Sequence, residues 1–253
     1  GKSSIAVNVA AAIAARGYKV GLMDVDIHGP SIPQMLGIPV IQEQQNTSTD
    51  SMSANTISYA NGKIIPAGVT GSLSVVSIEC MLESNATAVI WRGPLKIGVI
   101  RQFLSDVAWG ELDYLIIDSP PGTGDEPLTV AQTIPDAHAI IVTTPQEVSL
   151  RDVRKSINFC RQVNLDITGL IENFSGFICP SCKTRIDLFK TGGGKSTAEQ
   201  MNITLLGTLP VFPEMVAACD QGVAAVDKSD IVKQAFDPVV EKIIAGASVV
   251  SGK

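Results

Sequence analysis

The sequence predicts an α/β fold in which a mostly parallel sheet is flanked by helices. Short apolar runs that end in a polar residue and a turn are typical of buried parallel strands, and they alternate here with longer segments of helical spacing. The chain has 253 residues and 45% hydrophobic content, which is enough to bury a large core, so we expect a single domain over residues 1–253. The expected strands are 18–23, 73–78, 114–117, 139–143, 167–171 and 205–209, and the expected helices are 2–16, 95–109, 149–163, 197–201 and 230–245.

The composition argues against two classes of protein. The formal net charge is -6 at pH 7, so we expect no nucleic-acid partner, because a nucleic-acid surface needs a basic face. No apolar run approaches the roughly 18 residues that cross a bilayer, and no signal peptide is visible, so we expect no stable membrane association. The chain has 5 cysteines, and without a secretory cue they favour a reducing, cytoplasmic compartment over a disulfide scaffold.

The first residues carry the first functional pattern. Gly1-Lys2-Ser3-Ser4 opens a segment of helical spacing that stops at Gly17. The pattern is typical of the end of a phosphate-binding P-loop, where backbone amides and the helix N-terminus surround phosphate, Lys2 reaches the terminal phosphates and Ser3 ligates Mg²⁺. Because the chain begins inside this motif and without Met, we expect it to be a piece of a longer protein.

The expected strand 18–23 delivers Asp24-Val25-Asp26 to the edge of the sheet where parallel strands end. We interpret Asp26 as the group that orients the water attacking the terminal phosphate. The alternative is that these carboxylates only cap and shape a turn. Residues 27–37 are expected to form a loop over the crevice, and the polar residues 40–61 a surface insertion to which we assign no function.

The stretch around Asp118 supplies the other half of a metal-nucleotide site. Asp118 closes an apolar run, and a carboxylate at such a strand tip can hold a metal-bound water. Gly122 and Gly124 let the backbone approach a phosphate, which a side chain would block. The alternative is an ordinary strand followed by a proline turn. The pairing with Lys2 favours the nucleotide site, because such a site needs both halves.

Two later strands add cofactor-binding candidates. Asn173 follows the expected strand 167–171 and lies where a base would sit if the phosphates bind Lys2. Its amide can both donate to and accept from adenine, although a turn Asn is the alternative. Pro210, which ends the strand 205–209, is included in the same group.

Cys179 and Cys182 lie in the segment 174–195, which we expect to be a metal or cluster loop. Two thiolates separated by two residues can bind one metal, and sulfur ligands favour zinc or iron-sulfur clusters. Four sulfurs are normally needed and the chain has no second such pair, so two chains would share the metal across a twofold axis. A redox disulfide and a zinc clip are the alternatives. The redox motif belongs at the start of a helix, which Pro180 and Lys183 do not favour.

Several other features are interpreted as structural. The segment 192–197, Gly-Gly-Gly-Lys-Ser-Thr, resembles a second P-loop, but Phe189 stands where the first Gly belongs and no buried strand precedes it, so we expect a flexible turn that caps the helix 197–201. The last helix is expected to pack on the sheet rather than on a membrane. Its expected apolar face consists of Ile231, Ala235, Val239 and Ile243, and the cysteines expected in the core are Cys80, Cys160 and Cys219.

Taken in order, the motifs resemble those of a known family. They are Gly-Lys-Ser-Ser, Asp-Val-Asp-Ile-His-Gly-Pro-Ser-Ile-Pro, Trp-Arg-Gly-Pro, Asp-Tyr-Leu-Ile-Ile-Asp-Ser-Pro-Pro-Gly-Thr-Gly-Asp, Thr-Thr-Pro-Gln, Glu-Asn-Phe and Cys-Pro-Ser-Cys. This order is similar to the Mrp/ApbC family of iron-sulfur cluster carrier ATPases, within the MinD/ParA-like group of P-loop NTPases. The resemblance covers nearly the whole chain.

The resemblance implies a homodimer that binds and hydrolyses ATP with Mg²⁺. It further implies that Cys179 and Cys182 of both subunits hold a 4Fe-4S cluster, which is passed to apo iron-sulfur proteins. Asp26 would then lie in the first switch segment and Asp118 with Gly122 in the second. One alternative is a MinD/ParA-like positioning ATPase, which would have no use for the cysteine pair. The other is a dimer with structural zinc, since zinc accepts four thiolates equally well.

Overall fold

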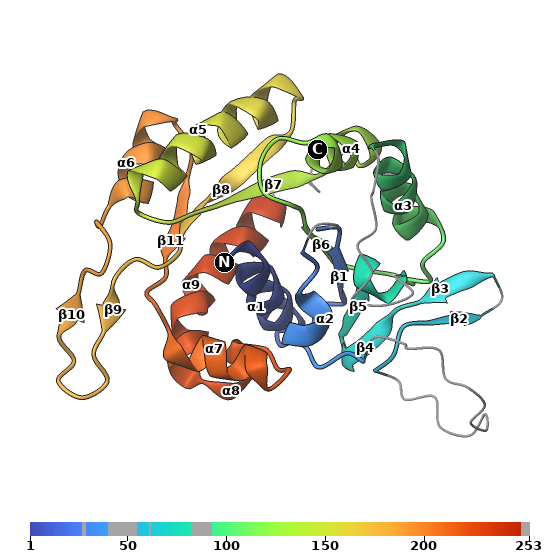
Figure 1. Ribbon diagram of the computed structural model, residues 1–253, viewed down its shortest axis with the longest axis horizontal. Helices are drawn as coiled ribbons and strands as arrows, with labels where there is room; N and C mark the ends of the chain where they lie inside the picture. Colours follow the sequence, from blue (N-terminus) through green and yellow to red (C-terminus); the bar gives the residue numbers. More distant parts are fainter. Residues whose placement is uncertain (27–28, 40–54, 61, 82–92, 249–253) are drawn as a thin grey trace. The chain divides into compact units, whose positions relative to one another are not determined.

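A computed structural model describes the chain except for residues 27–28, 40–54, 61, 82–92 and 249–253 (Figure 1). The chain divides into two compact units. The first unit comprises Lys2–Thr129 and Met215–Lys228, and the second comprises Gly1, Val130–Glu214 and Ser229–Lys253. Both units combine helices with parallel strand pairs, which confirms the α/β class that the sequence predicts.

The first unit is built on a sheet of strand order β4-β5-β1-β6. β1 (Val20–Asp24) pairs in parallel with β5 (Leu73–Ser77) and with β6 (Tyr114–Asp118). Every residue of β1 is buried, because β1 lies between two strands and α1 (Lys2–Ala14) packs on it. The antiparallel strands of this unit are β4 (Ala67–Thr70), which pairs with β5, and the hairpin of β2 (Ser58–Ala60) and β3 (Lys63–Ile65).

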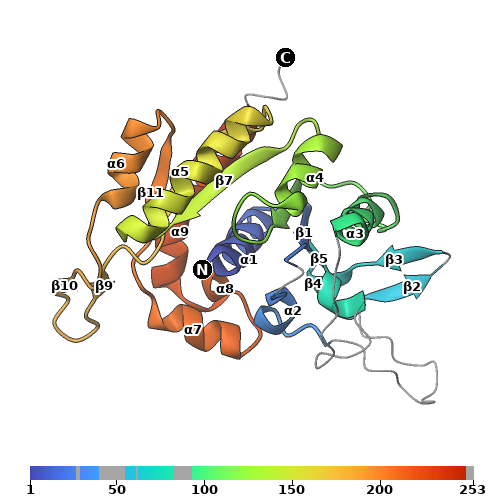
Figure 2. The same cartoon turned by 45° about the horizontal axis from the view of Figure 1, so that its top comes forward.

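α1 is the central helix of the first unit. It ends at Ala14, and the chain then turns at Gly17, whose φ of +90° favours glycine. Asn8 is fully buried in α1, and its side-chain oxygen accepts the Val226 N–H at 2.9 Å, which fixes α8 against α1 (Figure 2). The remaining short elements are α2 (Ile32–Met35), η1 (Ile78–Met81), α3 (Gly93–Ser105), α4 (Asp125–Thr133), α7 (Pro213–Asp220) and α8 (Ala225–Lys228).

The second unit is built on a parallel sheet of order β11-β8-β7. Leu170 of β8 belongs to the buried cluster formed with α5, whereas its neighbour Ile171 pairs with Gly207. A Cβ atom at Gly207 would lie 2.5 Å from the Val239 side chain of α9. Because successive strand residues point to opposite faces, α5 and α9 cover opposite faces of the sheet. The elements are β7 (His138–Thr143), α5 (Glu147–Gln162), β8 (Asp166–Glu172), α6 (Gly193–Gln200), β11 (Leu205–Thr208) and α9 (Asp230–Ser248).

The structure corrects two predictions about helices. α6 begins at Gly193 rather than at Thr197, so the glycine-rich segment is part of the helix and not a flexible turn. α9 packs on β8 and β11 as expected, and Val239 and Ile243 are buried as predicted, but Ile231 is 59% exposed and Ala235 is only partly buried. The buried face therefore overlaps the expected face only in part. The buried face consists of Val232, Phe236, Val239, Val240 and Ile243.

The three cysteines that we expected in the core have different outcomes. Cys160 is buried in the cluster beneath α5, as predicted. Cys219 is only partly buried, and the side chain of Cys80 lies outside the part that the structure describes. Within the described ranges, no helix is long and apolar enough to cross a membrane.

Candidate nucleotide site and cysteine hairpin

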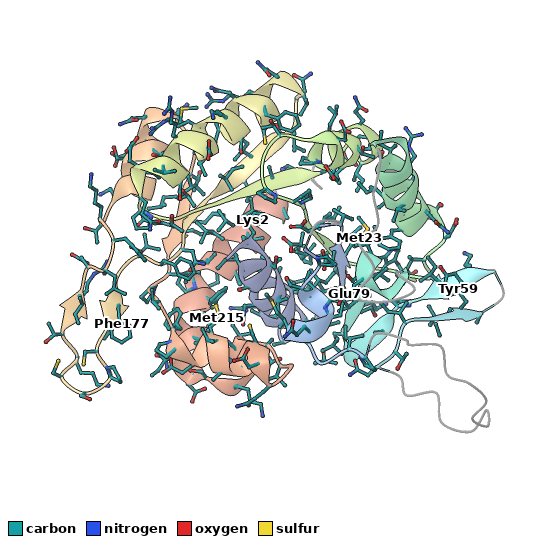
Figure 3. The ribbon with its side chains drawn as sticks, viewed as in Figure 1. Lys2, Met23, Tyr59, Glu79, Phe177 and Met215 are labelled. Atoms are coloured by element: carbon teal, nitrogen blue, oxygen red, sulfur yellow. The ribbon has the colours of Figure 1, made fainter. Side chains whose placement is uncertain are left out.

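Asp118 lies at the carboxyl end of β6, in register with Asp24 at the end of β1. The Val25 N–H donates to the Asp118 carbonyl at 3.0 Å, so the two strand ends are held side by side. Asp118 is only 4% exposed, and burial raises the pKa of its carboxyl group. A hydrogen bond from Ser3 and the charge of Lys2 oppose this rise in pKa. The structure therefore brings Lys2, Ser3 and Asp118 together at the start of α1, where Figure 3 labels Lys2.

Asp24 is a buried carboxylate that accepts backbone hydrogen bonds from the chain after β1, which agrees with the capping and turn alternative for the Asp-Val-Asp pattern. Its oxygens accept the N–H groups of Asp26 at 3.1 Å, Ser31 at 3.3 Å and Ile32 at 3.4 Å. They also accept the Ser77 hydroxyl at 3.1 Å. Asp24 thus holds both ends of the segment that follows β1.

Burial, together with the negative charge of Asp118, raises the pKa of Asp24 to about 7. The hydrogen bonds from Asp26, Ile32 and Ser77 limit the rise, because they stabilise the ionised form. Asp26 lies close enough for its charge to raise the pKa of Asp118. Asp118 therefore lies within electrostatic reach of both Asp24 and Asp26 at this edge of the sheet.

The loop after β6 contains the two predicted glycines. Gly122 has a φ of +100°, which favours glycine, and a Cβ atom there would meet nothing within 4 Å. The backbone conformation is thus one reason for glycine at this position, beside the close phosphate approach that we expected. A Cβ atom at Gly124 would lie 3.1 Å from the Glu126 carboxylate.

Ser4, the other predicted phosphate-binding residue in the first turn of α1, accepts the Asn8 side-chain amide at its carbonyl oxygen, at 2.8 Å.

Asn173 follows β8 in the second unit and is 2% exposed. Its Oδ1 atom accepts the Phe174 N–H at 2.9 Å, whereas its buried Nδ2 atom has no hydrogen-bond partner among the described residues. A Cβ atom at Gly1 would lie only 2.5 Å from this Nδ2 atom, so a side chain at position 1 would fill the space beside it. A buried donor without a partner is costly, and it fits an acceptor on a nucleotide base.

Pro210 lies beside this strand end. Glu172 and Thr208 pair in register, and beyond them the Leu209 N–H donates to the Glu172 carbonyl at 2.8 Å. The Ser175 N–H in turn donates to the Leu209 carbonyl at 2.9 Å. The chain on both sides of Pro210 and Asn173 is therefore fixed by backbone hydrogen bonds.

The two site cysteines lie on a hairpin of β9 (Phe177–Ile178) and β10 (Arg185–Ile186). In its turn, the Cys179 N–H donates to Thr184 at 3.0 Å and the Lys183 N–H donates to Cys179 at 2.9 Å. Figure 1 shows the hairpin extending away from the three-stranded sheet, and Figure 3 labels Phe177 on β9. A turn, rather than a helix, holds the pair, which agrees with our argument against a thioredoxin-type redox site.

Both cysteines of the hairpin are free thiols, and Cys182 is exposed. The Cys182 Sγ and Thr184 Oγ1 atoms are 3.3 Å apart. Hydrogen bonds from the hydroxyl and backbone of Thr184, and from Cys179, lower the pKa of Cys182 to about 7. A thiol with a lowered pKa is partly thiolate at neutral pH, and the thiolate is the form that binds metal. Thr184 is a site residue that the sequence analysis did not identify.

The Cys-bearing segment also exposes apolar side chains. Four of the large apolar residues that are exposed in the described ranges lie between 178 and 189. A separate finding is that the described part of the chain contains no group of three or more His, Cys, Asp and Glu side chains that could hold a metal ion, so one chain alone offers only the cysteine pair on this segment. The exposed apolar residues on this segment are Ile178, Ile186, Leu188 and Phe189.

The fold and the carboxylate edge beside Lys2 and Ser3 define a P-loop NTPase of the MinD/ParA type. Solved structures agree. The nucleotide-binding protein of Archaeoglobus fulgidus in complex with ADP matches with a TM-score of 0.72 and 33% identity, over 90% of this chain and 84% of that chain. The cell division ATPase MinD of Pyrococcus furiosus matches with a TM-score of 0.61 and 20% identity, over 97% and 93%, which shows the shared fold.

Sequence comparisons identify the family within this class. Residues 1–244 match the family model described as ParA: NUBPL iron-transfer P-loop NTPase. The iron-sulfur cluster carrier protein of Methanocaldococcus jannaschii is 46% identical over 245 residues, which cover 96% of this chain and 80% of that protein. The cytosolic Fe-S cluster assembly factor CFD1 of Candida glabrata is 48% identical over 220 residues, or 85% and 73%. The chain therefore belongs to the family of NUBPL-type iron-transfer P-loop NTPases, which confirms the resemblance drawn from the motifs.

Proposed function

We propose that this protein hydrolyses ATP and carries a 4Fe-4S cluster between two identical subunits, from which the cluster passes to apo-proteins. The observation that carries the proposal is the hairpin with Cys179 and Cys182, both free, one with a pKa of about 7. The pair supplies half of the four thiolates that such a cluster needs, and a second copy supplies the rest. The names of the relatives from M. jannaschii and C. glabrata support this cargo and a cytoplasmic setting.

The nucleotide half of the proposal rests on α1 and the strand ends. Lys2 is assigned to the terminal phosphates, and the Ser3 hydroxyl to Mg²⁺, with Asp118 acting through a bound water. When bound, Mg²⁺ neutralises charge on the phosphates. Asp26 is assigned to orient the attacking water. The hydrogen bond from Ser3 to Asp118 and the charge of Lys2, which lowers the pKa of Asp118, support these roles.

The remaining residues are assigned to binding rather than to chemistry. The buried Asn173 amide, which has a donor to spare among the described residues, is assigned to the adenine base. Pro210 is assigned to the same binding group because it lies beside this strand end. The backbone at Gly1, Ser4 and Gly122 is assigned to the phosphates.

Hydrolysis is coupled to the cluster through the segments that follow β1 and β6. Asp24 fixes the N–H groups of Asp26, Ser31 and Ile32 by hydrogen bonds, so these three residues are held at the end of β1. Loops that are held by a terminal phosphate relax when that phosphate leaves. We infer that this change reaches the contact between subunits and so alters access to the cluster.

Anaerobic reconstitution of the protein with iron and sulfide tests the proposal. We expect about four irons and four sulfides for every two chains, with an iron-sulfur absorption spectrum. Cys179→Ala and Cys182→Ala should lose the cluster and still bind ATP, whereas Cys219→Ala, which alters a partly buried cysteine elsewhere, should keep both properties. A protein that binds zinc but no sulfide would instead support the alternative of a dimer with structural zinc. Protein without metal would favour a positioning ATPase.

A further inference from the structure

Glu172 is a fully buried carboxylate to which none of the roles above is assigned. It is the last residue of β8 and directly precedes Asn173. Its Oε1 atom accepts the Ser175 hydroxyl at 2.6 Å, and its Oε2 atom accepts the backbone N–H of Gly194. Charge-assisted hydrogen bonds of this kind are stronger than neutral ones. One carboxylate therefore joins two parts of the chain that are separated by about twenty residues.

The bond to Gly194 explains the glycine-rich segment that resembles a second P-loop. Gly194 lies in the first turn of α6, so its free N–H faces an anion, as in a P-loop, but here the anion is Glu172. A Cβ atom at Gly194 would lie 2.8 Å from Glu172 Oε2. At Gly193 it would lie 2.6 Å from Leu150 and 2.8 Å from the Pro145 carbonyl. The glycines thus allow α6 to approach the end of β8 closely.

The two partners of Glu172 lie at the two ends of the cysteine-bearing segment. Ser175 precedes β9, and Gly194 follows β10. The base of the hairpin is held further by Arg185, which donates to the Ser175 carbonyl at 3.0 Å, and by the Val211 N–H, which donates to Gly176 at 2.8 Å. Glu172 therefore closes the base of the segment whose turn carries the two thiols.

We propose that Glu172 is a positioning residue that fixes the Cys179 and Cys182 hairpin to the strand end bearing Asn173. Glu172 and Asn173 are consecutive, so a displacement of the Asn173 amide by a bound base is transmitted to Ser175 and Gly194. Nucleotide binding thereby changes the mobility of the hairpin. The link to cluster handling rests on the proposed function, whereas the attachment of the hairpin does not.

Hydrogen exchange of the cluster-free protein tests the attachment. In Glu172→Ala, amides between residues 176 and 193 should exchange about tenfold faster, because a buried N–H and a hydroxyl lose their acceptor. Glu172→Gln should restore protection, because its amide oxygen can accept from Gly194 while its NH₂ group donates to Ser175. ATP should change hairpin exchange in the wild type and have a smaller effect in Glu172→Ala.

Arg161→Ala is the matched control. Arg161 donates to the Met201 carbonyl at the opposite end of α6, so this variant should leave hairpin exchange unchanged. If Glu172→Ala does not fold, as judged by circular dichroism, Ser175→Ala removes one of the two bonds and should give a smaller acceleration. Wild-type protection of the hairpin in Glu172→Ala, or in Ser175→Ala where only that variant folds, would overturn the proposal.

Cluster content separates the two proposals. After reconstitution, Glu172→Ala should hold less iron than the wild type, and Glu172→Gln should recover it. If the wild type itself binds no cluster, the proposed function fails while the exchange result still decides the attachment. If Glu172→Ala loosens the hairpin but retains the full iron content and spectrum, the positioning role for the thiols is contradicted.

Discussion

Asp24 and Asp118 occupy matched positions at the ends of β1 and β6, and both carboxylates are buried. Burial raises the pKa of Asp24, and the negative charge of the nearby Asp118 raises it further. A cation bound beside these strand ends would relieve this repulsion. The two strand ends therefore bring two buried carboxylates within electrostatic reach of each other.

We expect Asp24 to titrate near pH 7 in the protein without nucleotide or metal. Its folded-state pKa of about 7 lies above the ordinary 3.8, so the folded protein binds a proton that the unfolded chain has released. The resulting contribution to stability is complete below about pH 3.8 and is lost as the pH rises through about 7. The carbon-13 shift of the Asp24 carboxyl group measures this directly. A midpoint near pH 4 would contradict the electrostatics described here.

Asp118→Asn should slow Mg²⁺-dependent ATP hydrolysis. The carboxylate accepts a hydrogen bond from Ser3, and loss of such an outer partner of a metal typically costs about 10- to 100-fold in activity or metal affinity. The Mg²⁺ concentration at half-maximal rate should rise. Asp113→Asn is the control, because Asp113 precedes the same strand at its other end and accepts the Lys19 N–H at 2.7 Å. Equal rates of ATP hydrolysis in Asp118→Asn and Asp113→Asn would contradict a role of Asp118 in holding Mg²⁺.

The sequence predicts these strand ends well because parallel strands place their terminal polar residues at one edge. Asp118 could be found from an apolar run and a glycine turn within a short stretch. Glu172 could not, because its partners Ser175 and Gly194 become neighbours only after the hairpin has formed. For the same reason the glycine-rich segment was misinterpreted as a flexible turn.

Asn173→Ala should weaken ATP binding and reduce the preference for ATP over GTP. Loss of one hydrogen bond costs roughly 0.5–1.5 kcal/mol, or about two- to tenfold in Kd. Calorimetric titration with both nucleotides measures the affinity and the preference together. An unchanged ATP to GTP ratio would contradict a contact between the Asn173 amide and the base.

Cys182 should react with a thiol-alkylating reagent with a midpoint near pH 7 in the cluster-free protein. The hydroxyl and backbone of Thr184 stabilise the thiolate and lower its pKa, so Thr184→Val should move the midpoint to higher pH. Peptide mapping by mass spectrometry follows Cys182 separately from the buried Cys160. If the pH dependence of Cys182 alkylation is the same in Thr184→Val as in the wild type, the Thr184 hydroxyl does not stabilise the thiolate.

Gly207→Ala should destabilise the second unit, because the new methyl group would lie 2.5 Å from Val239 of α9. Overpacking of this kind typically costs about 1–3 kcal/mol, which chemical denaturation can measure. Gly98→Ala is the control, because a Cβ atom there meets nothing within 4 Å and alanine favours a helix. Equal stability of Gly207→Ala and the wild type would contradict the packing of α9 on β11.

The orientation of α9 shows the limit of periodicity in this chain. The apolar pattern predicts the helix and its packing against the sheet, and the structure confirms both. It also offers two overlapping faces, one that includes Ile231 and one that includes Val232. Val239 belongs to both faces, and its contact at Gly207 joins distant parts of the sequence, so the apolar pattern alone does not choose between Ile231 and Val232.

Native mass spectrometry of the anaerobically reconstituted protein tests the central claim most directly, because it counts chains, irons and sulfides in one particle. The account predicts two chains with one 4Fe-4S cluster, and single chains without iron when Cys179 or Cys182 is replaced by Ala. A cluster carried by a single chain, or a dimer that retains its cluster without these cysteines, would contradict it.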